Sequence, residues 1–152
     1  MSQLLVVRSE RVVFPDGMRP ASIHVRDGRI VAVRDYSERP AGVRELDAGD
    51  LVVMPGLVDS HVHINDPGRA DWEGWATGTA AAATGGTTTV IDMPLNAHPP
   101  TLDASSFRAK LEAAEAGAVT DFAFWGGLVI DPQHHTITLN GAERSLDHVA
   151  DA

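Results

Sequence analysis

Residues 58–69 read VDSHVHINDPGR and place two histidines two positions apart in a mostly apolar run. Side chains alternate along a strand, so Asp59, His61 and His63 are expected on one face. The run ends at Pro67-Gly68, and in parallel α/β folds the carboxyl ends of the strands carry the active site. The segment therefore predicts that His61 and His63 bind one metal ion at a strand end. Taken alone, they also fit a hydrogen-bonded pair of core histidines, and that alternative stays open.

The composition limits the partners of the chain. Its 152 residues include 12 basic and 21 acidic side chains, for a formal net charge of -9, and no cysteine. A negative chain repels polyanions, which disfavours nucleic acid and anionic membrane surfaces as partners. Disulfides and cysteine-ligated zinc are excluded. The N-terminus lacks a signal-peptide core, and no apolar run approaches the roughly 20 residues of a membrane span, so a soluble, cytoplasmic protein is expected.

The first part of the chain, to about residue 54, shows the pattern of short β-strands. Asp27-Gly28 separates two runs of alternating apolar residues, and this pair favours the positive φ angles of a type I′ hairpin turn. His24, within the hairpin, is expected to point to solvent. The predicted strands cover residues 4–7, 11–14, 21–26 and 29–34.

From residue 51 onward, strands alternate with helices. This order predicts a βαβαβ unit with parallel strands, and the apolar character of the first strands predicts burial on both faces. One helix is expected to begin at an Asp71 N-cap and to end at Gly85-Gly86. Beyond residue 130 the sequence is polar and irregular, with a short helix expected over 146–152. The expected strands of this part are 51–54, 57–64, 87–93 and 119–130; the helix that begins at Asp71 covers 71–84, and a further helix is expected over 102–116.

Residues 54–63, MPGLVDSHVH, resemble the first barrel strand of the amidohydrolase superfamily, whose signature is Pro-Gly-x-x-Asp-x-His-x-His. Within that superfamily, HINDPGR (63–69), Trp72-Glu73-Gly74 and Met93-Pro94-Leu95-Asn96 are similar to the allantoinases. Dihydroorotases usually have arginine in place of Asn65 and lack a residue equivalent to Leu95. The likeness spans roughly residues 1–130 and is most specific between 54 and 96.

The resemblance implies an α/β fold in two parts. Residues 1–53 would form part of a small β-sandwich. Residues 54–152 would form the first three βα units of an incomplete (β/α)8 TIM-like barrel. A closed barrel of this type needs about 250 residues, so the chain would hold only the amino-terminal portion of the protein.

The implied reaction is hydrolysis of the cyclic amide of allantoin to allantoate, in purine catabolism. Two divalent metals, zinc being the expected ion, would hold the attacking hydroxide. By motif, His61 and His63 would ligate one metal, Asn96 and Asn65 would bind the small-molecule substrate, and Asp59 would support the strand end. The bridging lysine and the catalytic aspartate are expected beyond the chain end, so no catalytic residue is assigned. A homo-oligomer is compatible with the complete protein.

Other chemically capable residues have plainer interpretations. His98 is expected to face solvent, and Asp92 to be a buried polar partner near the site. Lys110 lies on a helix, which is the wrong element for a bridging lysine. His134-His135 is not assigned as a metal pair, because adjacent side chains on an irregular segment diverge. Packing anchors are predicted at Trp72, Trp75 and Trp125, and a strand-edge charge at Asp121.

Three functions remain open from the sequence. The first is an allantoinase-like hydrolase represented by an incomplete chain that is inactive alone. The second is a non-catalytic module that associates with a full-length partner. The third is a related cyclic amidase, such as a dihydroorotase or dihydropyrimidinase, against which Asn65 and Leu95 argue.

Overall fold

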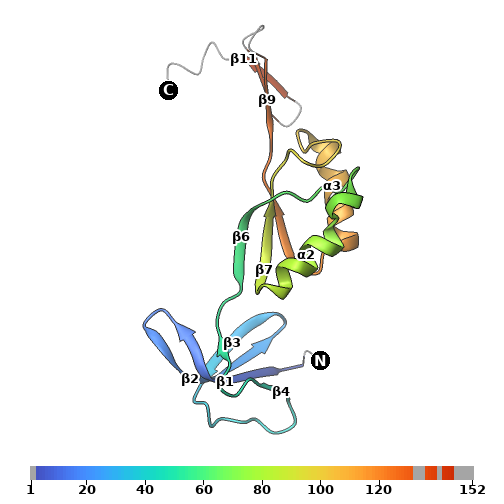
Figure 1. Cartoon of the computed structure of the whole chain (residues 1–152). Helices are drawn as coiled ribbons and strands as arrows, with labels where there is room; N and C mark the ends of the chain where they lie inside the picture. Colours follow the sequence, from blue (N-terminus) through green and yellow to red (C-terminus); the bar gives the residue numbers. More distant parts are fainter. Residues whose placement is uncertain (1–2, 132–135, 140–141, 146–152) are drawn as a thin grey trace. The chain divides into compact units, whose positions relative to one another are not determined.

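The computed structural model describes residues 3–131, 136–139 and 142–145, and it divides the chain into two compact units (Figure 1). The first unit is Met1–Pro55 and the second is Gly56–Ala152. The sequence had suggested a boundary between residues 53 and 54. His134-His135 and the helix expected over 146–152 lie outside the described residues.

The first unit contains one mixed sheet in the order β3-β2-β1-β4, with β5 also paired to β1. The β1–β2 and β2–β3 pairs are antiparallel, and β4 and β5 run parallel to β1. Asp27 and Gly28 have φ angles of 51° and 71°, so the predicted hairpin turn is confirmed. The strands are β1 (Leu5–Phe14), β2 (Gly17–Arg26), β3 (Arg29–Arg34), β4 (Arg44–Asp47) and β5 (Val52–Val53).

β1 is one strand, where two strands over residues 4–7 and 11–14 were expected. Its register against β2 shifts between Ser9 and Val12. At this irregularity Ser9 Oγ accepts a hydrogen bond from Arg11 N (2.8 Å) and donates one to Leu51 O (2.6 Å). The first bond satisfies the N–H of Arg11 at the irregularity, and the second ties β1 to the residue before β5, so the strand continues through the bulge.

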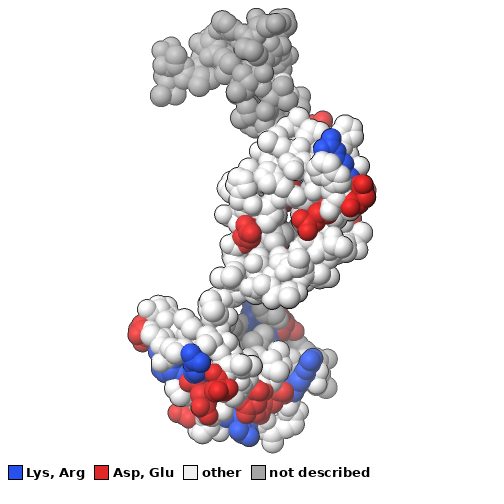
Figure 2. All heavy atoms as spheres, in the orientation of Figure 1, with Lys and Arg blue, Asp and Glu red and all other residues white. Residues whose placement is uncertain are grey.

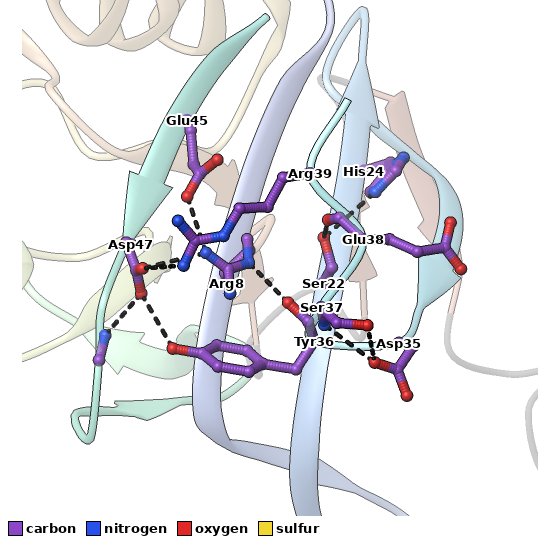
Figure 3. A network of polar contacts seen from close by, with 11 residues as sticks. Arg8, Ser22, His24, Asp35, Tyr36, Ser37, Glu38, Arg39, Glu45 and Asp47 are labelled. Carbon is purple, nitrogen blue, oxygen red and sulfur yellow. Dashed lines mark hydrogen bonds and ion pairs between the residues drawn. The ribbon is translucent and has the colours of Figure 1, made fainter. Parts of the chain in front are cut away.

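A cluster of polar side chains covers one face of this sheet (Figure 3). Arg8 is buried, and its Nη1 donates to Glu45 Oε1 (2.8 Å) and Asp47 Oδ2 (3.0 Å). Its Nε donates to Tyr36 O (2.8 Å), and its guanidinium carbon lies 4.1 Å from the centre of the Tyr36 ring. A buried charge is tolerated only with such partners, so Arg8 on β1 bonds two carboxylates of β4 and ties Tyr36, in the segment after β3, to the sheet.

His24 belongs to the same face and is buried, so the prediction that it points to solvent is wrong. It is 8% exposed, and its Nε2 lies 3.2 Å from Ser22 Oγ, which donates to Glu38 O (3.2 Å). The segment around Glu38 packs over this face. Strand alternation correctly places His24 on the face opposite Ile23 and Val25. The prediction failed because the segment around Glu38 covers the face that carries His24.

The opposite face of the sheet is apolar. It carries a groove of about 450 Å³ between β1, β2, β3 and residues 53–55. A second sheet over this face is not seen among residues 3–55. The β-sandwich therefore stays a prediction.

Acidification is expected to weaken the polar cluster. The pKa of Asp47 lies below its ordinary value because Gly49 N–H donates to its carboxylate and Arg8 and Arg39 are close, although burial opposes the shift. Such a carboxylate contributes stability that is complete above its unfolded pKa of about 3.9 and is lost as pH falls through the lower folded value. Asp47→Asn should therefore be less stable at neutral pH and lose less on acidification. Urea unfolding followed through β2 amide NMR signals, from about pH 2 to pH 7, measures this difference in stability.

The control is Asp50→Asn, at an exposed position, which should follow the wild type. If Asp47→Asn and the wild type lose stability equally on acidification, Asp47 does not have this role.

The second unit is built on three parallel strands in the order β6-β7-β8. Helices α2 and α3 lie on one side of these strands (Figure 1), where Ile64, Trp75, Val90 and Ala114 form the core. The predicted parallel βαβαβ order is therefore present. The elements are β6 (Leu57–Val62), α1 (Ala70–Glu73), α2 (Trp75–Thr84), β7 (Thr87–Asp92), α3 (Ala104–Gly117) and β8 (Asp121–Phe124).

β6 is more exposed than predicted. Burial on both faces was expected, yet Leu57 is 51% and Val58 62% exposed. β6 is an edge strand of the three-stranded sheet, and the helices that pack on this sheet contact it from one side, where Val62 meets the core. The prediction assumed strands covered on both sides, which the described residues do not provide.

The single helix expected over 71–84 is two helices. Gly74 is extended (φ −92°, ψ 174°) and separates α1 from α2, so Asp71 lies within α1 and does not cap a longer helix. α3 starts at Ala104 rather than at residue 102. Its cap is Asp103, whose Oδ1 accepts hydrogen bonds from Ser105 N (2.9 Å) and Ser106 N (2.8 Å).

The strand expected over 119–130 ends at Phe124. Gly127 N donates to Thr101 O (3.1 Å), and a Cβ on Gly127 would lie 2.5 Å from Leu102 Cδ2, so the chain leaves β8 through a close approach that glycine permits. The irregular stretch expected after residue 130 instead contributes to an antiparallel sheet in the order β11-β10-β9. A third barrel helix is not seen among the described residues. The added strands are β9 (Leu128–Asp131), β10 (Thr136–Leu139) and β11 (Ala142–Ser145).

Charged side chains are unevenly distributed over the face shown in Figure 2. They gather on the first unit, where both signs are interspersed, and are sparse on the second. Among the described residues, no helix has the length and apolar character to cross a membrane.

Candidate metal and substrate site

His61 and His63 lie side by side at the end of β6. Their ring centres are 5.1 Å apart in an edge-to-face arrangement, and both side chains are exposed in the described structure. Alternation along β6 places them opposite Val62, which packs against the core. Their exposure argues against the alternative of a buried histidine pair.

The two rings fit the geometry of two ligands of one divalent metal. Metal–nitrogen bonds of about 2.0–2.1 Å at tetrahedral angles place two imidazole centres about 5 Å apart. The observed separation of 5.1 Å is close to this value. Among the described residues, however, no group of three or more His, Cys, Asp or Glu side chains comes together. This part of the chain therefore offers two donors, and a complete site needs further ligands.

Asp59 bonds to the backbone of the pair. Its Oδ1 accepts a hydrogen bond from His61 N at 3.1 Å. This contact suits the supporting role that the resemblance implies, because it orients the backbone of His61 and leaves the imidazole free.

A buried ion pair holds the residue that follows His63. Lys110 extends from α3 and is fully buried; its Nζ lies 2.8 Å from Asp92 Oδ2 and donates to Ile64 O (2.7 Å). Asp92 ends β7, and its Oδ1 accepts a hydrogen bond from Ile64 N (2.6 Å). Burial raises the pKa of Asp92, and the bonds from Lys110 and Ile64 N–H oppose that shift. The N–H and the C=O of Ile64 are thus both bonded to side chains.

The expectation for Asp92 is confirmed, since it is 1% exposed and bonded next to the histidine pair. The burial of Lys110 was not foreseen from the sequence. The available signal was its spacing, because Lys110 lies three residues after Phe107 and four before Ala114, on the apolar side of α3.

Asn65 and Asn96 follow β6 and β7 but differ in exposure. Asn65 is 7% exposed; its N donates to Glu73 O (2.9 Å), at the last residue of α1, and its O accepts from Arg69 N (2.9 Å), just before the first, so its backbone is bonded at both ends of α1. Its Oδ1 has no partner in the described part of the chain. Asn96 is partly exposed in the turn after β7. Substrate contact by either amide stays a prediction.

The loops after β6 and β7 contact each other. His98 N donates to Pro67 O (2.8 Å), and the His98 side chain is exposed, as predicted. Gly68 has a φ of +94°, and a Cβ there would lie 2.4 Å from His98 O, so both the backbone angle and the space require glycine. The contact brings the segments that carry Asn65 and Asn96 to the same edge of the sheet.

The three tryptophans have different environments. Trp75 is 0% exposed and is a packing anchor, as predicted. Trp72 is 73% exposed, so the same prediction is wrong there, because the short helix α1 turns it outward. Trp125 is 50% exposed, and its Nε1 donates to Ser60 O (3.0 Å), which ties the end of β8 to β6. Asp121 is exposed at the start of β8, as expected.

Residues 52–150 match the model of the Amidohydrolase family. The chain is 53% identical over 128 residues to an allantoinase of Streptomyces avermitilis, which covers 84% of the chain and 29% of that protein. It is 45% identical over 139 residues to a mitochondrial allantoinase of Aquarana catesbeiana, covering 91% of the chain and 29% of that protein. The chain therefore spans less than a third of the length of these curated relatives.

Solved structures share the fold. An L-hydantoinase (dihydropyrimidinase) from Arthrobacter aurescens superposes with a TM-score of 0.72 at 38% identity, covering 84% of this chain and 28% of that one. A dihydropyrimidinase from Brevibacillus agri gives a TM-score of 0.69 at 27% identity, covering 88% and 29%. The chain thus has the fold of the corresponding portion of these larger proteins.

Proposed function

The chain belongs to the amidohydrolase family, and from that premise we propose that it is the amino-terminal portion of a metal-dependent hydrolase that converts allantoin to allantoate. The observation that carries the proposal is the exposed His61–His63 pair at the end of β6, with ring centres 5.1 Å apart. The similarity to proteins named allantoinases, at 53% and 45% identity, supports the choice of substrate.

Each residue of the candidate site has a proposed role. His61 and His63 hold one divalent cation, which would supply Lewis-acid polarisation of the ring carbonyl when bound. Asn96 offers an amide that both donates and accepts hydrogen bonds, as the ring amides of allantoin require. Asn65 is assigned to the same end of the sheet; its Oδ1, which has no partner among the described residues, supports a polar contact there, and its burial restricts that contact to a group that reaches between the loops.

The remaining features of the complete enzyme are also proposals. The cation is zinc, as one of two ions in the full site. The bridging lysine and the catalytic aspartate lie outside these 152 residues, so this chain is inactive alone. A place in purine catabolism, a cytoplasmic location and a homo-oligomeric state belong to the same proposal. The proposal also includes the predicted fold, in which these residues form part of a β-sandwich and the first units of an incomplete (β/α)8 barrel.

Two other functions have specific support. The similarity to an L-hydantoinase structure favours a related cyclic amidase as the second candidate, although Asn65 and Leu95 favour allantoin. The exposed edge strand β6, with Leu57 and Val58 on its surface, favours a non-catalytic module that pairs with a full-length partner. If the chain is such a non-catalytic module, replacing both histidines with alanine would leave its association with the partner intact.

Metal binding by the 152-residue chain tests the proposed site. His61→Ala and His63→Ala are each expected to weaken Co²⁺ binding at least about 10-fold, because each removes one nitrogen ligand. The control His98→Ala removes an exposed histidine from the neighbouring loop and should leave binding unchanged. Isothermal titration calorimetry with Co²⁺ and Zn²⁺ gives the affinities. Equal affinities for the wild type and both site variants would refute the histidine pair as ligands.

Turnover assays separate the candidate substrates. The isolated chain should not hydrolyse allantoin, hydantoin or dihydroorotate with Zn²⁺, Co²⁺ or Mn²⁺. Turnover at about 1 per second or faster, the range of ordinary enzymes, would refute inactivity. The product of the full-length gene should prefer allantoin, and a preference for hydantoin would favour the second candidate.

A further inference from the structure

Lys110 and Asp92 hold a piece of backbone that the sheet does not hold. β6 ends at Val62, and the parallel pairing with β7 stops there. Ile64, two residues later, instead donates its N–H to Asp92 Oδ1 (2.6 Å) and accepts from Lys110 Nζ at its carbonyl (2.7 Å). His63 thus lies between the end of the ladder and a residue whose N–H and C=O are both fixed.

Packing alone does not explain this ion pair. Lys110 and Asp92 are 0% and 1% exposed, and burying two opposite charges often costs more than their attraction returns. Apolar side chains of similar volume would fill the same space. They would not bond the peptide groups of Ile64, itself 4% exposed, which would then be buried without partners.

The backbone on either side of a ligand decides where its imidazole points. Metal sites need ligands held to within about 0.5 Å of their productive positions. At His61, Asp59 Oδ1 bonds the residue's own N–H (3.1 Å). His63 follows the last residue of β6. Its backbone is held through the next residue, Ile64, which bonds Asp92 of β7 and Lys110 of α3.

We propose that Lys110 and Asp92 are positioning residues for His63 and thereby set the affinity of the histidine pair for a divalent cation. The inference rests on the proposed function, in which His61 and His63 bind that cation. Without the ion pair, the segment after β6 loses its anchor. The two imidazoles then converge on a cation for a smaller fraction of the time.

The test uses Co²⁺ alone and the 152-residue chain. Lys110→Met keeps an unbranched side chain that is one heavy atom shorter and removes the charge and the donors. It is expected to weaken Co²⁺ affinity about 10–100-fold, as loss of groups that orient metal ligands does. The matched control is Arg108→Met, on the same helix but exposed, which should bind Co²⁺ like the wild type.

A spectroscopic readout separates positioning from general destabilisation. In the metal-free chain, the imidazole NMR signals of His63 should shift and broaden in Lys110→Met while those of His61 stay in place. If Lys110→Met does not fold, Asp92→Asn replaces it, because it keeps an oxygen for Ile64 N–H and removes the charge that holds Lys110. The same selective change at His63 is expected.

The outcomes distinguish this proposal from the proposed function. A folded Lys110→Met or Asp92→Asn variant with wild-type Co²⁺ affinity and unchanged His63 signals overturns the positioning role. Co²⁺ binding that is absent, or unaffected by His61→Ala, instead refutes binding of the cation by the histidine pair of this chain. In that case a selective change at His63 in the metal-free chain still supports positioning.

Discussion

Replacing Trp75 with alanine is expected to destabilise the second unit by about 3–5 kcal/mol, the usual cost of truncating a buried tryptophan. Trp75 is 0% exposed, and its ring centre lies 5.5 Å from that of Phe122 and 5.7 Å from that of Phe124. The truncation removes these contacts and leaves a cavity between α2 and β8. Because small domains are stable by only about 5–15 kcal/mol, the loss is a large share of the total.

Urea unfolding followed by far-UV circular dichroism measures this loss without relying on tryptophan fluorescence, which the substitution itself changes. Trp72→Ala is the matched control, since it removes the same side chain from a position that is 73% exposed. Its effect should stay within about 0.5 kcal/mol. Equal losses in the two variants would mean that Trp75 is not the centre of this core.

The histidine pair could be predicted because local rules decide its geometry. The period of two along a strand places His61 and His63 on one face whatever the strand packs against. Pro67-Gly68 marks where the strand must have ended. The Asp27-Gly28 turn was predictable for the same reason, since its positive φ angles are a property of those two residues.

The burial of Lys110 depends on contacts that local rules do not contain. The carbonyl it bonds belongs to Ile64, which is 46 positions away in the sequence. Helical spacing placed Lys110 among the apolar residues of α3, but a lysine there normally reaches solvent with its charge. The ion pair could be predicted only by knowing that α3 packs on the sheet where Asp92, the last residue of β7, is buried beside Lys110.

The covered face of the first sheet was likewise a matter of distant contacts. Alternation separates His24 from Ile23 but does not say which face is covered. The structure covers the polar face, because Arg8 bonds Tyr36 and Asp47 and so holds the segment after β3 over it. Sequence patterns that assume an apolar interior therefore assigned His24 to solvent.

Lys110→Met alone is expected to cost about 3–5 kcal/mol, because it leaves Asp92 as a buried charge without its partner. The double variant Lys110→Met/Asp92→Leu removes both charges, so its loss should be smaller than the sum of the two single losses. Urea unfolding of the wild type, the two single variants and the double variant gives the coupling. Arg108→Met, on the exposed side of the same helix, controls for the loss of a basic residue from α3.

The double variant also tells an ordinary ion pair from one that anchors the backbone. Where two buried charges bond only each other, apolar replacements are often neutral or stabilising. Here the replacement also strips the N–H and C=O of Ile64 of their partners, at about 1–3 kcal/mol for each unsatisfied group. The double variant should therefore remain less stable than the wild type by a few kcal/mol. Full recovery would mean that water or other groups satisfy Ile64 without help, and that the backbone after β6 needs no ion pair to hold it.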